Sequence, residues 1–192
     1  TIVRLMDGLA TLPHEVSVLV VDDASPDGTA QVVRDYASRN PARSIEVLVR
    51  QGAPRGLGYA YRDGFLKARE AQVDGILQMD ADGQHPVETV NSLASAIERG
   101  ADLAIASRYI EGGTTGDWKG QRKILSRLGG GVARTLLGLK VQDLTGGFKL
   151  WRRELLAAMD LSSVKARGFV FQIEMTLRAS RMGANIIEVP FA

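Results

Sequence analysis

Apolar segments rich in β-branched residues alternate with helical segments along the first half of the chain, and this alternation constrains the fold most. Residues 16–21, Val-Ser-Val-Leu-Val-Val, are typical of a buried central strand of a parallel sheet. Further strands are predicted at residues 45–49, 74–79 and 102–106, with helices between them at 30–39, 59–70 and 87–99. A strand–helix–strand order indicates a three-layer α/β fold with one mostly parallel central sheet and helices on both faces.

The ends of the chain and its second half depart from this order. Residues 1–12 have apolar side chains at helical spacing, and a sheet domain that begins with a helix suggests that a first strand is missing. The remaining expected elements are a basic helix at 119–137, a loop leading into a strand at 143–151, a helix at 153–159, a helix ending at 182 and a last strand at 186–189. Since the sequence has no internal repeat and no linker, we expect residues 1–192 to form one domain.

The composition excludes several kinds of site. The chain has no cysteine, so it has no disulfide, no thiolate metal site and no cysteine nucleophile. Two histidines are too few for a histidine-rich metal site, and a formal net charge of +2 does not argue for a nucleic-acid partner. No apolar run reaches the roughly 18 residues that a membrane-spanning helix requires.

Oxygen-bearing side chains follow the predicted strand at 74–79. In the segment 79–86, Asp80, Asp82 and Gln84 alternate, so an extended loop would direct all three to the same side. The carboxyl ends of strands are where open α/β sheets bind ligands, and clustered oxygens suit a hard cation such as Mg2+ or Mn2+. The alternative is an acidic turn that only caps the following helix.

A second acidic pair, Asp22 and Asp23, follows the strand at 16–21. An acid at this position can accept hydrogen bonds from a ribose or a base. The glycines Gly52, Gly56 and Gly58 do not have the spacing of a dinucleotide-binding loop, and no phosphate-binding loop with its Gly-Lys-Ser/Thr ending occurs. With such loops absent, a metal ion is the natural holder of a diphosphate.

The ordered set of motifs resembles a known family. Each motif is weakly specific alone, but together they cover nearly the whole chain. The matching stretches are residues 20–29, 56–58, 79–86, 107–109, 112–113, 143–148, 168–174 and 188–190, with Trp118, Arg122 and Ser126. The chain looks like a family 2 glycosyltransferase with the GT-A fold (a nucleotide-diphospho-sugar transferase), of the polyprenol-phosphate or dolichol-phosphate mannosyltransferase type. Compared with that family, it lacks the first strand and a C-terminal segment.

The resemblance implies metal-dependent, inverting transfer of mannose from GDP-mannose to polyprenyl (dolichyl) phosphate, with Mg2+ or Mn2+ as cofactor. It implies a peripheral enzyme at the cytoplasmic face of a membrane, attached directly or through a membrane-anchoring partner. The acceptor is a phosphate monoester with a second pKa of about 6, so it is already anionic near pH 7 and requires no strong general base. It requires cations, and arginine matches phosphate geometry.

The resemblance also implies roles for individual residues. Asp23 and the backbone at Val21 would contact the nucleoside, while Asp80 and Ala81 would line the donor pocket. The expected metal ligands are Asp80, Asp82 and Gln84. The expected lipid-phosphate ligands are Arg108 and Arg122, which with Asp82 form the expected catalytic set. Asp143 and the turn Gly146-Gly147-Phe148 would border the sugar.

Alternatives stay open at this point. The donor could be UDP-glucose or another sugar nucleotide, and the chain could be a non-catalytic subunit that binds nucleotide sugars. Arg122 could belong to a solvated basic stripe of its helix. His85 is interpreted as structural rather than catalytic. Four aromatic residues are interpreted as packing residues rather than as sugar platforms: Phe148, Trp151, Phe169 and Phe171.

Overall fold

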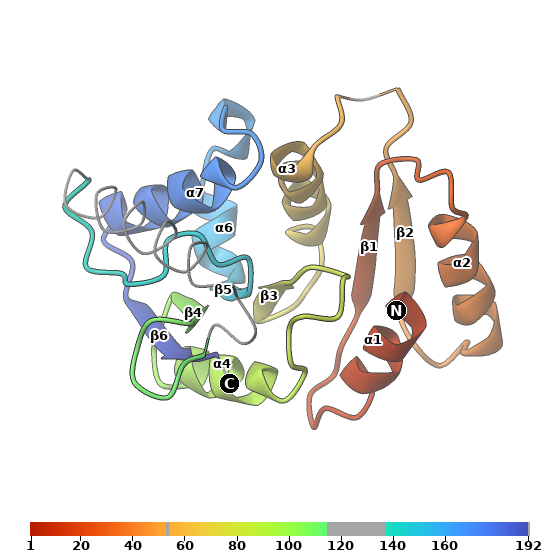
Figure 1. Ribbon diagram of the computed structural model, residues 1–192, viewed down its shortest axis with the longest axis horizontal. Helices are drawn as coiled ribbons and strands as arrows, with labels where there is room; N and C mark the ends of the chain where they lie inside the picture. Colours follow the sequence, from red (N-terminus) through yellow and green to blue (C-terminus); the bar gives the residue numbers. More distant parts are fainter. Residues whose placement is uncertain (53, 115–136, 192) are drawn as a thin grey trace.

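The computed structural model describes residues 1–52, 54–114 and 137–191 and confirms the predicted α/β class (Figure 1). The elements occur in the order α1 (Ile2–Leu9), β1 (Val18–Asp22), α2 (Thr29–Arg39), β2 (Ile45–Val49), α3 (Leu57–Ala68), β3 (Gly75–Gln78), α4 (Thr89–Glu98), β4 (Leu103–Ser107), β5 (Lys149–Arg152), α6 (Arg153–Ala158), the 3-10 turn η1 (Leu161–Ser163), α7 (Val170–Arg181) and β6 (Ile186–Pro190). The expected helix at 119–137 and the residues Trp118 and Arg122 fall outside the described ranges, Leu137 excepted.

The strands form two sheets rather than the single sheet predicted. β1 and β2 pair in parallel. The other four strands follow the order β3-β5-β4-β6, and β5 is antiparallel to both of its neighbours. The predicted strand–helix alternation covered only the first half of the chain, whereas β5 comes from the second half and inserts between β3 and β4. The direction of such an inserted strand depends on where its loop returns to the sheet, and local pattern does not encode that.

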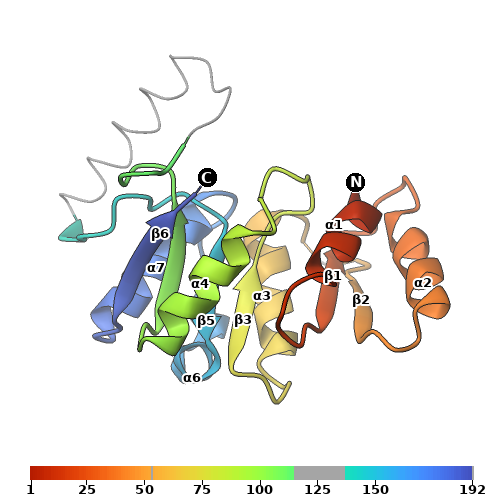
Figure 2. The same ribbon diagram turned by 90° about the horizontal axis from the view of Figure 1, so that it is seen from below.

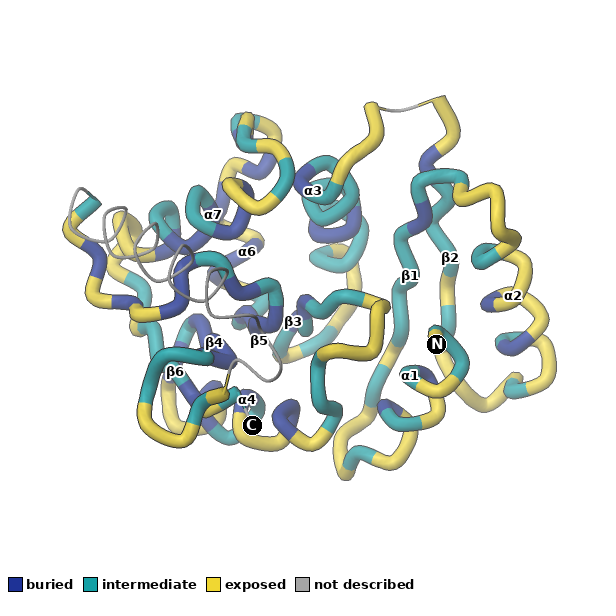
Figure 3. The backbone as a smooth tube through the Cα atoms, in the orientation of Figure 1, coloured by how far each residue is buried: buried dark blue, intermediate teal, exposed yellow. Residues whose placement is uncertain are grey.

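Residue alternation along the strands divides the core into two layers. Leu103 and Ile105 of β4 pack with α3, α6 and α7 on one face, and Ala104 and Ala106 pack with α4 on the other. The two-stranded sheet has its own cluster, in which Met6 of α1 and residues of α2 cover one face. Figure 3 shows buried positions concentrated where these helices meet the strands. The arrangement confirms the three-layer prediction.

Helix α3 lies between the two sheets and packs against both (Figures 1 and 2). A Cβ on Gly64 would lie 2.9 Å from Val21 Cγ2 of β1, so this glycine allows the close approach. On the other side of the helix, the Phe65 ring contacts Trp151 edge-on, with ring centroids 5.8 Å apart. Helix α3 therefore fixes the position of one sheet relative to the other.

The loops that follow β1, β3 and β4 lie along one edge of the molecule, the upper edge in Figure 2. The loop that precedes β5 reaches the same edge, since β5 runs in the opposite direction. The predicted site residues Asp23, Asp80 and Arg108 lie on these loops. Among the described residues, no helix is both long enough and apolar enough to cross a membrane.

Candidate functional site

The loop after β3 is a turn, not the extended segment that residue alternation suggested. Residues 81–83 bend, and Gly83 adopts a φ of 81°, a left-handed conformation that favours glycine. The Gln84 backbone N–H donates to Asp82 Oδ1 at 2.9 Å, which fixes the turn. In a turn, the two-residue spacing of Asp80 and Asp82 does not by itself direct their carboxylates to the same side. Asp82 is exposed, and Asp80 is half-buried.

Asp80 is held by two ring side chains. The Tyr61 hydroxyl of α3 donates to Asp80 Oδ1. His85 Nδ1 accepts a hydrogen bond from the Asp80 backbone N–H at 3.0 Å, and the imidazole stacks on Phe148 with ring centroids 4.7 Å apart. Burial lowers the pKa of His85, which favours the neutral ring that this acceptor role requires. These contacts agree with a structural role for His85.

The side-chain oxygens on this loop suit a cation that is only partly enclosed by protein. Within the described ranges, no three side chains among His, Cys, Asp and Glu come together as a metal cage. Mg2+ and related ions commonly use one or two carboxylates and take their other oxygens from water and from a phosphate ligand. Asp80 and Asp82, on the same loop as Gln84, are chemically suited to this arrangement, so the residues present fit the implied metal.

Arg108 and Asp143 form a buried ion pair at the end of β4. Arg108 Nε donates to Asp143 Oδ2 and its Nη2 to Oδ1, both at 2.7 Å, and the Asp143 side chain is fully buried. Burial would raise the pKa of Asp143, but the hydrogen bonds from Arg108 outweigh it and lower the pKa. Asp143 also accepts from the Gly146 N–H at 3.0 Å, and its own N–H donates to Glu188 of β6. The pair thus fixes the loop that leads to Gly147.

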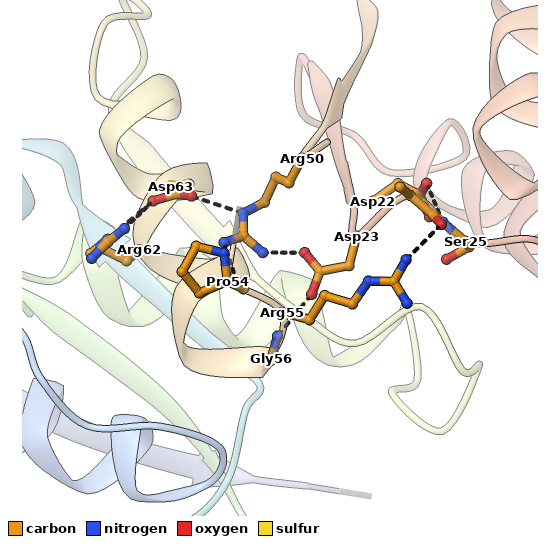
Figure 4. A network of polar contacts seen from close by, with 10 residues as sticks. Asp22, Asp23, Ser25, Arg50, Pro54, Arg55, Gly56, Arg62 and Asp63 are labelled. Carbon is orange, nitrogen blue, oxygen red and sulfur yellow. Dashed lines mark hydrogen bonds and ion pairs between the residues drawn. The ribbon is translucent and has the colours of Figure 1, made fainter. Parts of the chain in front are cut away.

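A second charged network lies beside β1 (Figure 4). We call Asp23, Arg50, Asp63 and Gly56 the arginine clamp. The Arg50 guanidinium, with its side chain only 3% exposed, pairs with Asp23 and with Asp63, and the Gly56 N–H donates to Asp23 Oδ2 at 2.9 Å. The clamp joins the loop after β1 and the end of β2 to α3, through Gly56 at the start of that helix and Asp63 in its middle.

Arg50 was not among the predicted site residues, although its position offered a signal. It directly follows the apolar strand β2, and a charged residue at a strand end lies at the ligand-binding edge. Burial would lower the pKa of Arg50, yet its hydrogen bonds to Asp63 and Asp23 raise it, so the guanidinium stays charged. The Asp23 carboxylate is therefore already engaged by the protein through both oxygens.

A third polar group is buried at the end of β3, two residues before Asp80, and sequence reasoning missed it as well. Trp151 Nε1 donates to Gln78 Oε1 at 3.1 Å, and Gln78 Nε2 donates to Gln172 Oε1 at 2.8 Å. We call these three residues the amide chain. Gln78 is a polar residue inside an apolar strand, which is a signal of a buried hydrogen-bonded partner. That partner, on α7, lies 94 residues away in sequence and has no local signal.

Lys149, the first residue of β5, is completely buried beside this chain. Its Nζ donates to the Gln172 carbonyl at 3.1 Å and to Thr176 Oγ1 at 2.9 Å. Burial lowers the pKa of Lys149 to about 7, although Asp143 acts in the opposite direction. No ion pair within the described part of the chain includes this lysine. It ties β5 to α7 through neutral partners.

The structure brings most predicted residues to one edge, but it does not join them into one cluster. Asp80, Ala81, Asp82 and Gln84 share the β3 loop, and Gly147 approaches Asp80. Val21 and Asp23 lie across α3 from them, and Arg122 is outside the described residues. Of the aromatic residues interpreted as packing, Phe148, Trp151 and Phe171 are buried. The interpretation was wrong for Phe169, which is 68% exposed because it precedes α7, beyond the apolar face of that helix.

Comparisons with known proteins agree with the motif resemblance. Residues 1–159 match the model of the family described as Glycosyl transferase family 2. The chain is 42% identical over 92% of its length to a polyprenol monophosphomannose synthase of Mycolicibacterium smegmatis, and it spans 66% of that relative. It is also 42% identical over 99% of its length to an undecaprenyl-phosphate mannosyltransferase of Micrococcus luteus, spanning 75% of it. The chain thus spans about two thirds to three quarters of these relatives.

A solved structure supports the fold. The glucosyl-3-phosphoglycerate synthase of Mycobacterium tuberculosis, crystallised with Mn2+, UDP-glucose and phosphoglyceric acid, superimposes with a TM-score of 0.59 at 18% identity. The match covers 100% of this chain and 74% of that protein. At this identity the likeness shows the fold alone, and it confirms the GT-A architecture expected from the motifs.

Proposed function

The chain belongs to glycosyl transferase family 2, and we propose that it transfers mannose from GDP-mannose to polyprenyl phosphate. Two relatives at 42% identity support this. One is named a polyprenol monophosphomannose synthase, and the other is named an undecaprenyl-phosphate mannosyltransferase. The observation that carries the proposal is the shared sheet edge: β3 and β4 run in the same direction, so the Asp80–Gln84 loop and Arg108 of the buried Arg108–Asp143 pair follow the same ends of their strands. One group suits a metal-bound diphosphate and the other suits an anionic acceptor.

On the donor side, we propose that Asp82 and Gln84, with Asp80 beside them, hold a divalent cation. A bound cation would neutralise the charge that develops on the nucleoside diphosphate as it leaves. The arginine clamp fixes the loop of Asp23 beside the nucleoside position, so that Asp23 and the backbone of Val21 can contact the ribose or the base. Both carboxylate oxygens of Asp23 retain lone pairs for such a contact.

On the acceptor side, we propose that Arg108 binds the lipid phosphate. Asp143 fixes the plane of the guanidinium through two hydrogen bonds, and this determines the direction from which an anion can approach. A phosphate oxygen then attacks the anomeric carbon as the bond to the diphosphate breaks, which inverts that carbon. Arg122 stays the proposed second phosphate ligand.

The acceptor also determines where the enzyme would act. Polyprenyl phosphate resides in a membrane, so we propose peripheral attachment at its cytoplasmic face, directly or through an anchoring partner. Cosedimentation with vesicles that contain polyprenyl phosphate tests direct attachment, and a protein that stays in the supernatant would require the partner.

A transfer assay tests the proposed reaction. Radiolabelled GDP-mannose, UDP-glucose and UDP-N-acetylglucosamine are compared as donors to a short polyprenyl phosphate, with Mg2+, Mn2+ or EDTA. We expect transfer from GDP-mannose, abolished by EDTA. Asp82→Ala should reduce turnover about a hundredfold or more, because several kcal/mol of charge stabilisation are lost.

Asp74→Ala is the matched control, since this exposed aspartate precedes β3 and Asp82 follows it. Turnover that resists EDTA, or a folded Asp82→Ala protein with normal turnover, would contradict the metal role. Faster transfer from UDP-glucose than from GDP-mannose would mean that UDP-glucose, and not GDP-mannose, is the donor. Absence of transfer from every donor would favour a non-catalytic subunit.

A further inference from the structure

Among the buried side chains of the described residues, one donor has no partner. This donor is the side-chain nitrogen of Gln172, Nε2, on a residue that is only 1% exposed. A buried amide N–H without an acceptor costs about 1–3 kcal/mol, so natural proteins rarely keep one unless something else satisfies it. Gln172 lies in the first turn of α7 and accepts a hydrogen bond from Gln78, the last residue of β3, two residues before Asp80.

The direction of this donor is fixed by chemistry. An indole N–H can only donate, so Trp151 requires the oxygen of Gln78 to face it. The nitrogen of Gln78 then faces Gln172, which must present its own oxygen in return. This leaves Gln172 Nε2 directed away from Gln78 and Trp151. Lys149 fixes the backbone at the same residue, since it donates to the Gln172 carbonyl. The orientation therefore does not depend on Gln172 alone.

The unpartnered donor faces an acceptor across a glycine. A Cβ added to Gly147 would lie 3.5 Å from Gln172 Nε2 and 3.4 Å from Asp80 Oδ2. These are ordinary van der Waals distances, and Gly147 has no left-handed φ, so an alanine would fit there without strain. A side chain at residue 147 would therefore contact both the fixed donor and the carboxylate, and the glycine keeps this position between them free, although the donor itself is covered from solvent.

A hydroxyl group satisfies both sides of this gap, because it accepts from the amide and donates to the carboxylate. We propose that Gln172 is a sugar-binding residue, whose Nε2 donates to a hydroxyl of the transferred sugar while that hydroxyl donates to Asp80. Trp151 and Gln78 are positioning residues for this contact. The inference rests on the proposed function, since it takes a sugar nucleotide as the ligand at this edge.

Calorimetric titration with GDP and with GDP-mannose, both with Mg2+, tests the assignment. Gln172→Glu keeps an oxygen for Gln78 but places a second acceptor where the donor was. We expect it to weaken GDP-mannose binding about tenfold or more and to leave GDP binding unchanged, because only the sugar loses a hydrogen bond. Gln31→Glu is the control, the same change next to Asp35 on the exposed face of α2.

Gly147→Ala tests the same contact in another way and applies even if Gln172→Glu does not fold. Its methyl group should occupy the position between Asp80 and Gln172 and cause the same selective loss. Equal losses of affinity for GDP and GDP-mannose would overturn the inference, and so would no loss for either. A result of this kind is expected if the Gln172 amide only binds a buried water.

The two proposals fail separately. Normal transfer by the wild type together with unaffected variants rejects the role of Gln172 alone. Selective loss of GDP-mannose binding without any transfer by the wild type rejects the reaction and retains the sugar contact. If the wild type binds UDP-glucose instead of GDP-mannose, the same titrations with UDP and UDP-glucose test the sugar contact of Gln172.

Discussion

The arginine clamp and the amide chain lie on opposite sides of α3 and hold their loops by different means. The clamp uses full charges: Arg50 bridges Asp23 and Asp63, whose side chains are 26% and 25% exposed. The amide chain uses neutral groups that are completely buried. Each charged group of the clamp has an ion-pair partner, with Arg62 as a second partner of Asp63, whereas the amide chain ends in an unpaired donor. This difference suggests that the first is mainly scaffold and the second is poised for a ligand.

The clamp should give the largest effect. Arg50→Ala removes the cation between two carboxylates, and breaking a buried ion pair typically costs about 3–5 kcal/mol. We expect a loss of that size in the free energy of unfolding, measured by urea denaturation. Arg34→Ala, on the exposed face of α2, should change it by less than about 0.5 kcal/mol. Similar losses for the two variants would show that the clamp carries little of the stability.

The buried lysine beside the amide chain should give a smaller, pH-dependent effect. The folded-state pKa of Lys149 is about 7, below the value of about 10.4 in an unfolded chain. Between these values the unfolded chain binds a proton that the folded protein does not, so stability should rise with pH. The slope is at most about 1.4 kcal/mol per pH unit.

Lys149→Met should remove this rise, because no proton is exchanged at residue 149 in either state. The measurement is urea denaturation of wild type and variant from pH 7 to 10, and the difference between the two curves isolates this residue. Lys140→Met, the same change at an exposed lysine, is the control. A difference that stays constant with pH would mean that Lys149 remains charged in the fold.

The smallest effect is expected at the other ion pair, and it distinguishes a ligand site from scaffold. Arg108→Lys keeps the charge but loses the forked geometry. We expect KM for polyprenyl phosphate to rise about tenfold, equivalent to about 1.4 kcal/mol, with KM for GDP-mannose unchanged.

The control for this variant is Arg99→Lys, an exposed arginine that precedes β4 and therefore lies at the opposite end of that strand from Arg108. If both KM values rise together, Arg108 acts like Arg50, as scaffold, and the two ion pairs are alike.

The sequence by itself determined the α/β class, most element positions and the loops that carry Asp23, Asp80 and Arg108, because hydrophobic periodicity and strand-end chemistry are local. Only the tertiary structure decided that β5 enters antiparallel between β3 and β4. That insertion places Lys149 and Trp151 under α7, where they position Gln172 beside Asp80. Partners separated by tens of residues leave no periodic signal, since their contact depends on how the chain returns and not on its local pattern.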